Sequence, residues 1–379
     1  MNIAFIDWFC NPRRPRYSGM SDIVWAIAER LAMLGDQVHV VAPYGPSPGF
    51  PVGVKVHQHG IPPMGYRNIV GNLMLSIMAW NEVRRIPSLD VVHAAEYLST
   101  SILLLLKLRT PVVLTTPGNI YERIDNINHF DYTVTEVYKW AARLTAKKGT
   151  RIIATSESMA YWWEFSGAPP LRIAKIPLGV DTRIFQPIPE AKKVLNLDSK
   201  PNILFVGRLQ SENGLFYLLQ AMANVIKEFP GARLDIVGDG PDKNRMIDLV
   251  SKLGLKDHIR WHGNVPFETL PLYYSACDVF ALPRLSRVTP RVLFEAMACR
   301  TVVITSEIGG IVDFVQDGIT GFLIPPYDSN LLAFRILQVL RNEIHSVGIA
   351  DAAHEFAVRN LDWDIIVHRL RTEVYETLP

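Results

Sequence analysis

The sequence predicts an α/β protein built from two Rossmann-like, doubly wound parallel-sheet domains that face each other across a cleft. The chain has 379 residues, more than one ordinary hydrophobic core holds and enough for two. Short apolar runs alternate with helical patterns in both halves, as in parallel sheets covered by helices. The proline-rich segment Gln186-Pro187-Ile188-Pro189 separates the halves and is typical of a linker.

The first predicted domain covers residues 1–184. Its helical patterns include Ile23, Ile27, Leu31 and Leu34, which recur at spacings of four and three. Short apolar runs typical of buried strands lie between such patterns: Ile3–Ile6, Val38–Val41, Val54–His57, Val91–His93, Val112–Thr115 and Ile152–Thr155. The C-terminal segment, 362–379, is predicted to be helical, with Ile366, Leu370 and Val374 on one face.

The second predicted domain covers residues 190–361 and repeats the alternation. A helix is expected from about Gly214 to Phe229, directly after the first strand of this half. The expected strands are Ile203–Val206, Arg233–Val237, Ile259–His262, Val279–Leu282 and Thr301–Thr305. Ligands of open α/β sheets bind at the carboxyl ends of the strands, so the site is expected there.

Composition narrows the class of protein. Hydrophobic residues make up 49% and charged residues 20%, as in soluble globular proteins, and a formal charge of +2 does not indicate a nucleic-acid partner. Cys10, Cys277 and Cys299 have no metal-ligand spacing and fit a reducing cytoplasm. The N-terminus reads at once as a strand rather than a signal peptide, and the apolar run Ile102–Leu106 is too short to cross a bilayer.

The most informative stretch runs from Pro283 to Gly310. It reads as the end of a strand, a loop, a short helix, a buried strand and a glycine turn. The helix is expected to begin near Pro290, because proline tolerates the missing amide partner at a helix start. A helix that begins after a parallel strand is a natural place for a phosphate group.

This stretch resembles the donor-binding signature of the family-four glycosyltransferases. In that family the loop reads Pro-Ser-x-x-Glu-x-Phe-Gly, and the helix after it carries Glu-Ala-Met-Ala, which is present here as Glu295-Ala296-Met297-Ala298. The resemblance covers nearly the whole chain and implies the GT-B fold. It also implies that the C-terminal helix, 362–379, packs back onto the first domain, and that the chain is a hexosyltransferase-like enzyme that moves a sugar from a nucleotide-sugar donor to an acceptor with retention of configuration. No metal cofactor is expected.

The resemblance also implies roles for individual residues. Arg208 is expected to hold the donor diphosphate, since its fork can bind two phosphate oxygens. Glu295 is expected to accept hydrogen bonds from the ribose hydroxyls. The implied donor-binding positions are Ser18, Gly19, Gly207, Arg208, Asn213, Gly263, Val265, Arg291, Val292 and Glu295. Arg208 and Arg287 are the candidates for balancing the charge of the leaving group.

Four positions depart from the family pattern. Arg287 stands where the first Glu of the pair is usual, and Asn213 stands where a lysine is usual. Pro290 replaces the loop glycine and has no N–H to donate. The strand Val112–Thr115 is followed by Thr116 and Pro117 rather than by a histidine. The departures indicate either a changed donor or lost catalysis.

Alternatives therefore stay open at this point. The chain could be an inactive descendant that binds a nucleotide or glycan or acts as a scaffold, or an epimerase that acts on a nucleotide sugar. Arg287 could neutralise phosphate, recognise an acidic donor sugar, or lie in solvent in a loop that has drifted. The sequence does not identify the sugar, the base, the acceptor or the oligomeric state.

Basic residues gather in the first half: Arg13, Arg14, Arg16, Arg143, Lys147, Lys148 and Arg151, with Trp140 among them. The simpler interpretation is a solvated face. The sharper interpretation is weak peripheral contact with anionic phospholipid, or with a phosphorylated acceptor. The acceptor itself is expected to be a glycan, a lipid or a small molecule.

Overall fold

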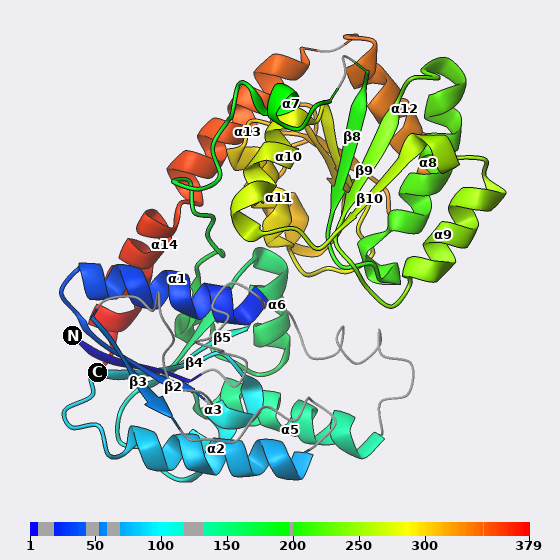
Figure 1. The fold of residues 1–379 in the computed structure, drawn as a ribbon. Helices are drawn as coiled ribbons and strands as arrows, with labels where there is room; N and C mark the ends of the chain where they lie inside the picture. Colours follow the sequence, from blue (N-terminus) through cyan, green and yellow to red (C-terminus); the bar gives the residue numbers. More distant parts are fainter. Residues whose placement is uncertain (7–18, 43–52, 59–68, 117–131, 198–199, 344) are drawn as a thin grey trace. The chain divides into compact units, whose positions relative to one another are not determined.

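The structure is a computed structural model that describes residues 1–379 except 7–18, 43–52, 59–68, 117–131, 198–199 and 344 (Figure 1). The described residues form two compact units. Unit 1 contains Met1–Leu178 and Trp363–Pro379, and unit 2 contains Gly179–Asp362. Each unit has its own parallel sheet.

Unit 1 is built on a seven-stranded sheet. Its strands are β1 Asn2–Ile6, β2 Gln37–Ala42, β3 Val54–Gln58, β4 Val91–Ala94, β5 Val112–Thr116, β6 Arg151–Ala154 and β7 Ile173–Lys175. They pair in the order β3-β2-β1-β4-β5-β6-β7, and every pair is parallel. Strand order reverses between β1 and β4, as in a doubly wound fold.

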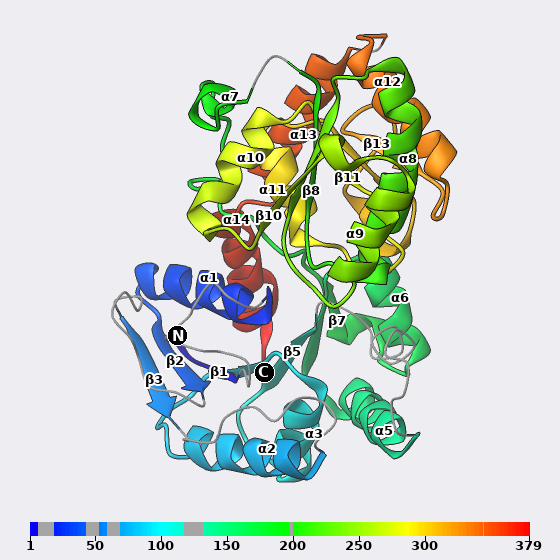
Figure 2. The same ribbon diagram turned by 45° about the vertical axis from the view of Figure 1, so that its right-hand side comes forward.

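Helices cover both faces of this sheet (Figures 1 and 2). The helices of unit 1 are α1 Gly19–Met33, α2 Ile69–Val83, α3 Tyr97–Leu105, α5 Tyr132–Lys148, α6 Glu157–Phe165 and α14 Trp363–Arg369. On one face, α1 packs against α14. On the other, α2, α3 and α5 pack side by side over the sheet. Among the helices that the structure describes, none combines the length and apolar character needed to cross a membrane.

Unit 2 repeats the plan with six strands. They are β8 Asn202–Val206, β9 Arg233–Val237, β10 Ile259–Gly263, β11 Val279–Leu282, β12 Val303–Ser306 and β13 Phe322–Ile324. They pair in parallel in the order β10-β9-β8-β11-β12-β13. The order reverses between β8 and β11, which are therefore the switch point of this sheet.

The helices of unit 2 divide between the two faces (Figures 1 and 2). They are α7 Ala191–Val194, α8 Leu215–Glu228, α9 Lys243–Lys252, α10 Leu270–Ala276, α11 Arg291–Ala298, α12 Ser329–Leu340 and α13 Ser346–Asn360. One face carries α8, α9 and α12, and the other carries α10, α11 and α13. The chain thus leaves β8 for one face and β11 for the opposite face.

All eleven predicted strands are present, and two more were not predicted. The extra strands, β7 and β13, have three residues each, too few to show a pattern. The last predicted strand begins at Val303 rather than Thr301. The reason is a turn: Arg300 has φ +61°, and the Thr301 hydroxyl donates to the carbonyl of Tyr274 at 2.7 Å.

The C-terminal segment is tied to the sheet of unit 1. Ile366, Leu370 and Val374 are buried, as predicted for one face of a helix. Beyond α14 the Tyr375 hydroxyl lies 2.5 Å from Nδ1 of His93, at the end of β4. Nε2 of the same ring lies 2.7 Å from the Thr115 hydroxyl on β5. Burial lowers the pKa of His93 from 6.5 to about 3, so the ring is neutral in this network.

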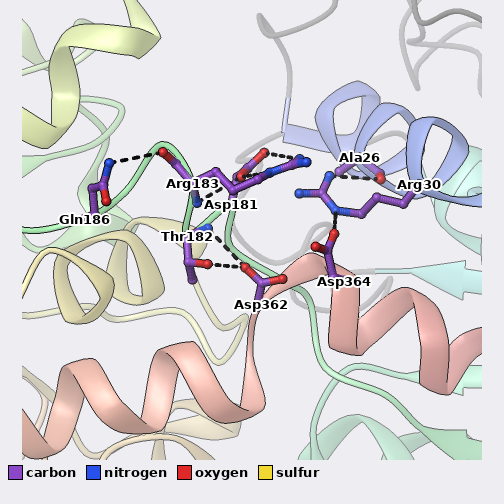
Figure 3. Close-up of polar contacts among 8 residues, drawn as sticks. All are labelled: Ala26, Arg30, Asp181, Thr182, Arg183, Gln186, Asp362 and Asp364. Carbon is purple, nitrogen blue, oxygen red and sulfur yellow. Dashed lines mark hydrogen bonds and ion pairs between the residues drawn. The ribbon is translucent and has the colours of Figure 1, made fainter. Parts of the chain in front are cut away.

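The second chain crossing between the units, at residues 362–363, is anchored on each side within its own unit (Figure 3). In unit 2, the Asp362 carboxylate accepts hydrogen bonds from the backbone and the hydroxyl of Thr182. In unit 1, Arg30 donates to Asp364 at 2.6 Å. Each end of this crossing is therefore held by a contact within its own unit.

The predicted basic surface is described in part. Arg13, Arg14 and Arg16 lie outside the described residues. Trp140, Arg143, Lys147 and Lys148 are exposed along one side of α5. Contact of this side with phospholipid stays a prediction.

Candidate active site

The switch point of unit 2 collects most of the predicted site residues. Gly207, Arg208 and Asn213 follow β8, whereas the loop 283–290 and helix α11 follow β11. Carboxyl ends of neighbouring parallel strands lie at one edge of the sheet, where open α/β sheets bind ligands. The fold therefore places these two groups of predicted residues at the same edge, although they lie far apart in the sequence.

The turn after β8 presents Arg208 to solvent. The backbone N–H of Gly207 donates to the Val237 carbonyl at 3.0 Å, which extends the β8–β9 pairing. The Arg208 carbonyl accepts a hydrogen bond from Nδ2 of Asn213 at 2.7 Å. The Arg208 side chain is exposed, and among the described residues its guanidinium has no hydrogen-bond or ion-pair partner. The backbone of Arg208 is therefore held by Asn213, while its guanidinium is free to bind a ligand.

Asn213 itself is buried and has internal partners. Its Oδ1 accepts a hydrogen bond from Arg284, a buried arginine two residues beyond the end of β11. Arg284 also donates from Nε to the Val288 carbonyl at 2.9 Å. Direct binding of a donor by Asn213 stays a prediction, but the described contacts give this residue a clear structural role.

Two glycines let the loop 283–290 pack closely against its neighbours. Gly214 has φ +74°, and a Cβ atom there would lie 1.7 Å from the Pro283 carbonyl oxygen. Gly309 has φ +55°, and a Cβ atom there would lie 2.2 Å from the Arg287 carbonyl oxygen. Only glycine fits such contacts at positive φ. The loop backbone is thus held from both sides, while the Arg287 side chain is exposed and has no partner among the described residues.

Helix α11 begins at Arg291, with Pro290 as its N-cap residue, close to the predicted start. Arg291 and Val292 form its first turn and are half-buried. The Glu295 carboxylate is buried and accepts a hydrogen bond from the Tyr274 hydroxyl at 2.9 Å. Burial, followed by the charge of Glu295, raises the pKa of Tyr274 well above its ordinary value, so this hydroxyl remains a donor.

The remaining predicted residues lie elsewhere. Gly263 ends β10 with φ +64°, and its carbonyl accepts from the Gly238 N–H at 2.7 Å. Val265 follows it and is half-buried. Gly19 begins α1 in unit 1, and Ser18 and Pro117 lie outside the described residues.

A cavity of about 300 Å³ lies beside the turn after β8, at the first turns of α8 and α9. Its walls include Leu209, Phe216, Met246 and Leu285, with Asp242 and Arg245 as charged lining residues. None of the predicted site residues lines it. This cavity is therefore distinct from the predicted donor-binding positions.

Sequence reasoning missed two residues of the site. Arg284 departs from the family signature, which has serine at this position, but its hydrogen-bond partner could not be inferred from the sequence. Nothing in the sequence marks Tyr274, since a tyrosine on the preceding helix is most often a core residue. The hydroxyl oxygens of Thr289 and Ser306 are also buried without a partner in the described part of the chain. Ser306 ends β12, and Thr289 lies in the loop between β11 and α11, so a ligand at this edge of the sheet could satisfy both hydroxyls.

Comparison with known families agrees with this geometry. Residues 17–184 match the family model described as Glycosyltransferase Family 4, and residues 187–356 match the model described as Glycosyl transferases group 1. The two matches follow each other and cover most of the chain. The chain belongs to glycosyltransferase family 4. The prediction that it is an enzyme of the glycosyltransferase class is confirmed at the level of the family.

Relatives of this family-four glycosyltransferase span its length to different extents. A phosphatidyl-myo-inositol mannosyltransferase of Mycobacterium leprae is 28% identical over 369 residues, covering 95% of this chain and 93% of that protein. A D-inositol 3-phosphate glycosyltransferase of Segniliparus rotundus is 28% identical over 277 residues, covering 70% of this chain. The match spans only 62% of the length of the Segniliparus protein.

Solved structures confirm the fold of this family-four glycosyltransferase. Sucrose-phosphate synthase from Thermosynechococcus elongatus superposes with a TM-score of 0.86 at 23% identity, covering 99% of this chain and 98% of that one. HepE from Anabaena, solved in complex with UDP, superposes with a TM-score of 0.80 at 20% identity, covering 99% and 100%. The predicted GT-B class with two Rossmann-like domains is confirmed.

Proposed function

We propose that this protein transfers a glycosyl unit from a nucleotide-sugar donor to an acceptor, and that unit 2 binds the donor. The observation that carries the proposal is the switch point itself. It presents two exposed arginines, Arg208 in the turn after β8 and Arg287 in the loop that leads from β11 into α11. Two cations next to a helix start suit a diphosphate. Relatives named as mannosyltransferases and a structural neighbour solved with UDP support the donor class.

The chemistry follows from the charge of the leaving group. As the acceptor oxygen bonds to the sugar carbon, the bond from that carbon to the diphosphate breaks. The acceptor oxygen attacks from the face that the diphosphate leaves, so that configuration is retained. Its proton passes to the departing phosphate oxygen, so no side chain serves as general base. Arg208, Arg287 and the first-turn amides of α11 stabilise the negative charge that develops on the diphosphate, without a metal ion.

Arg287 supports a second candidate for the donor. Its exposed guanidinium, in place of the usual carboxylate, would pair with the carboxylate of an acidic sugar as well as with phosphate. The acidic-sugar donor is therefore the alternative within the same reaction class.

Arg208→Ala tests the diphosphate assignment. Loss of one charge-assisted contact should weaken UDP or GDP binding by about 10- to 100-fold, because such bonds contribute roughly 1.5–3 kcal/mol. Uridine or guanosine, which lack the diphosphate, should bind as they do to the unaltered protein. Calorimetric titration measures all four ligands.

The matched control is Lys252→Ala, which removes an exposed cation of unit 2 at the end of α9. It should leave the affinities for the nucleoside diphosphates and for the nucleosides unchanged. Equal losses for the nucleoside and its diphosphate in Arg208→Ala would show that the arginine does not hold the phosphates. If neither UDP nor GDP binds to the unaltered protein, the proposed donor class is wrong.

Glu295→Gln tests ribose recognition. The carboxylate already accepts from Tyr274, and we propose that it also accepts from the ribose hydroxyls. The unaltered protein should therefore prefer UDP or GDP over the matching 2′,3′-dideoxy nucleotide, and Glu295→Gln should lose about tenfold of that preference. A preference that stays unchanged, together with a lower melting temperature, would mean that Glu295 serves only the core.

A further inference from the structure

Arg284 is a buried charge beside the proposed donor site. Only 9% of it is exposed, although arginine is rarely buried unless its charge is balanced or fully hydrogen-bonded. It lies two residues beyond the end of β11, at the switch point of the sheet. A residue that is costly to bury is expected to have a definite task there.

The hydrogen bonds of Arg284 join the two sides of the switch point. Nε donates to the Val288 carbonyl at 2.9 Å, which closes the loop around Arg287. A second guanidinium nitrogen donates to Oδ1 of Asn213. The other end of that amide, Nδ2, donates to the Arg208 carbonyl at 2.7 Å. One continuous path therefore runs from the loop that carries Arg287 to the turn that carries Arg208.

Asn213 is suited to the middle of this path. An amide has an acceptor at one end and donors at the other, so it can accept from a guanidinium and donate to a carbonyl at once. A lysine in its place would bring a second cation against Arg284 and would have no acceptor to offer. An uncharged amide at position 213 therefore gives the buried Arg284 an acceptor without placing a second positive charge beside it.

We propose that Arg284, acting through Asn213, is a positioning residue that holds Arg208 and Arg287 at the spacing needed to grip one diphosphate. The inference rests on the proposed function, because it gives both exposed arginines the same ligand. Arg284 need not touch the donor itself. Its contribution is the geometry of the two loops, since a bidentate contact depends on orientation as well as on charge.

The experiment is a double-mutant cycle on UDP or GDP binding, with Arg284→Met, Arg208→Ala and the double variant. Arg284→Met should weaken the nucleoside diphosphate by about tenfold and leave the nucleoside unchanged. The double variant should lose less affinity than the sum of the two single losses, because the part of the Arg284 effect that acts through Arg208 is already absent in Arg208→Ala. Additive losses, or an equal loss for the nucleoside, would overturn the proposal.

Two further variants separate geometry from charge and from folding. Arg284→Lys keeps the charge but cannot reproduce the forked contacts, so it should not restore affinity; affinity equal to that of the unaltered protein would overturn the proposal. Asn213→Asp keeps an acceptor for Arg284 but loses the donor to the Arg208 carbonyl. It should therefore show the same loss of diphosphate affinity with the fold intact, and normal affinity would count against the path.

Amide hydrogen exchange tests, in the absence of a ligand, whether Arg284 orders the two loops that carry Arg208 and Arg287. Arg284→Met should speed exchange at residues 208–213 and 285–288 relative to the rest of unit 2. Unchanged exchange in both segments would overturn the positioning role, whatever the binding results. Failure of the unaltered protein to bind UDP and GDP would instead overturn the proposed function, so the two failures are distinguishable.

Discussion

Replacing Gly214 with alanine is expected to lower the free energy of unfolding of unit 2 by about 2 to 5 kcal/mol. Gly214 has φ +74°, a conformation that costs an L-residue roughly 1–2 kcal/mol. The new methyl group would also lie 1.7 Å from the Pro283 carbonyl oxygen, so the backbone of the loop would have to shift. Thermal or urea unfolding measures the loss, and weaker nucleoside diphosphate binding should accompany it because the loop carries Arg287.

Gly254→Ala is the matched control for this substitution. Gly254 belongs to the same unit and has φ +69°, but a Cβ atom there would have no neighbour within 4 Å. Its alanine variant should therefore show only the conformational cost, roughly 1–2 kcal/mol, and normal ligand binding. The difference between the two variants isolates the contact with Pro283. Equal losses in both would contradict the close packing of the two loops.

The fold could be predicted because most of its strands are buried on both faces. Runs such as Ile203–Val206 are almost wholly apolar and are bounded by turn residues, a pattern typical of strands in the middle of a parallel sheet. The strands β7 and β13 escaped prediction because they have three residues each and lie at the edges of their sheets. Their existence depends on the neighbouring strand rather than on their own sequence, so local reasoning could not find them.

The candidate site was predictable where a local motif carries it and not where distant residues meet. The helix that starts after Pro290 follows from capping preferences, whereas Arg208 was singled out by the resemblance of its turn to the family's phosphate-binding turn. The partners Asn213 and Arg284 are 71 residues apart. Their bond depends on the strand order that makes β8 and β11 neighbours. Asn213 and Arg284 can each be read in the sequence, but only the strand order shows that the two side chains are in contact.

Unit 1 is expected to lose stability in acid because of His93. Burial lowers the pKa of this ring to about 3 in the folded protein, against an ordinary value of 6.5. The unfolded chain therefore binds the proton more readily, and the stabilising effect of the neutral ring is complete only above about pH 6.5. It should fall as the pH is lowered from 6.5 towards 3. At 1.36 kcal/mol for each pKa unit, the loss is about 2 kcal/mol at pH 5 and approaches about 5 kcal/mol at pH 3.

Two variants test this assignment by urea unfolding at pH 7.5 and pH 5. His93→Gln cannot take up the proton, so it should be less stable at pH 7.5 but should lose less stability on acidification. Tyr375→Phe removes the hydroxyl at 2.5 Å from Nδ1 but keeps the buried ring, so its pH dependence should persist. His39, whose pKa is lowered to about 4 by burial, by His57 and by Lys55, adds a residual loss of the same sign in every variant.

If His93→Gln retains the full pH dependence, another group is responsible for the acid sensitivity. If the unaltered protein is equally stable at both pH values, His93 is not held neutral by the fold.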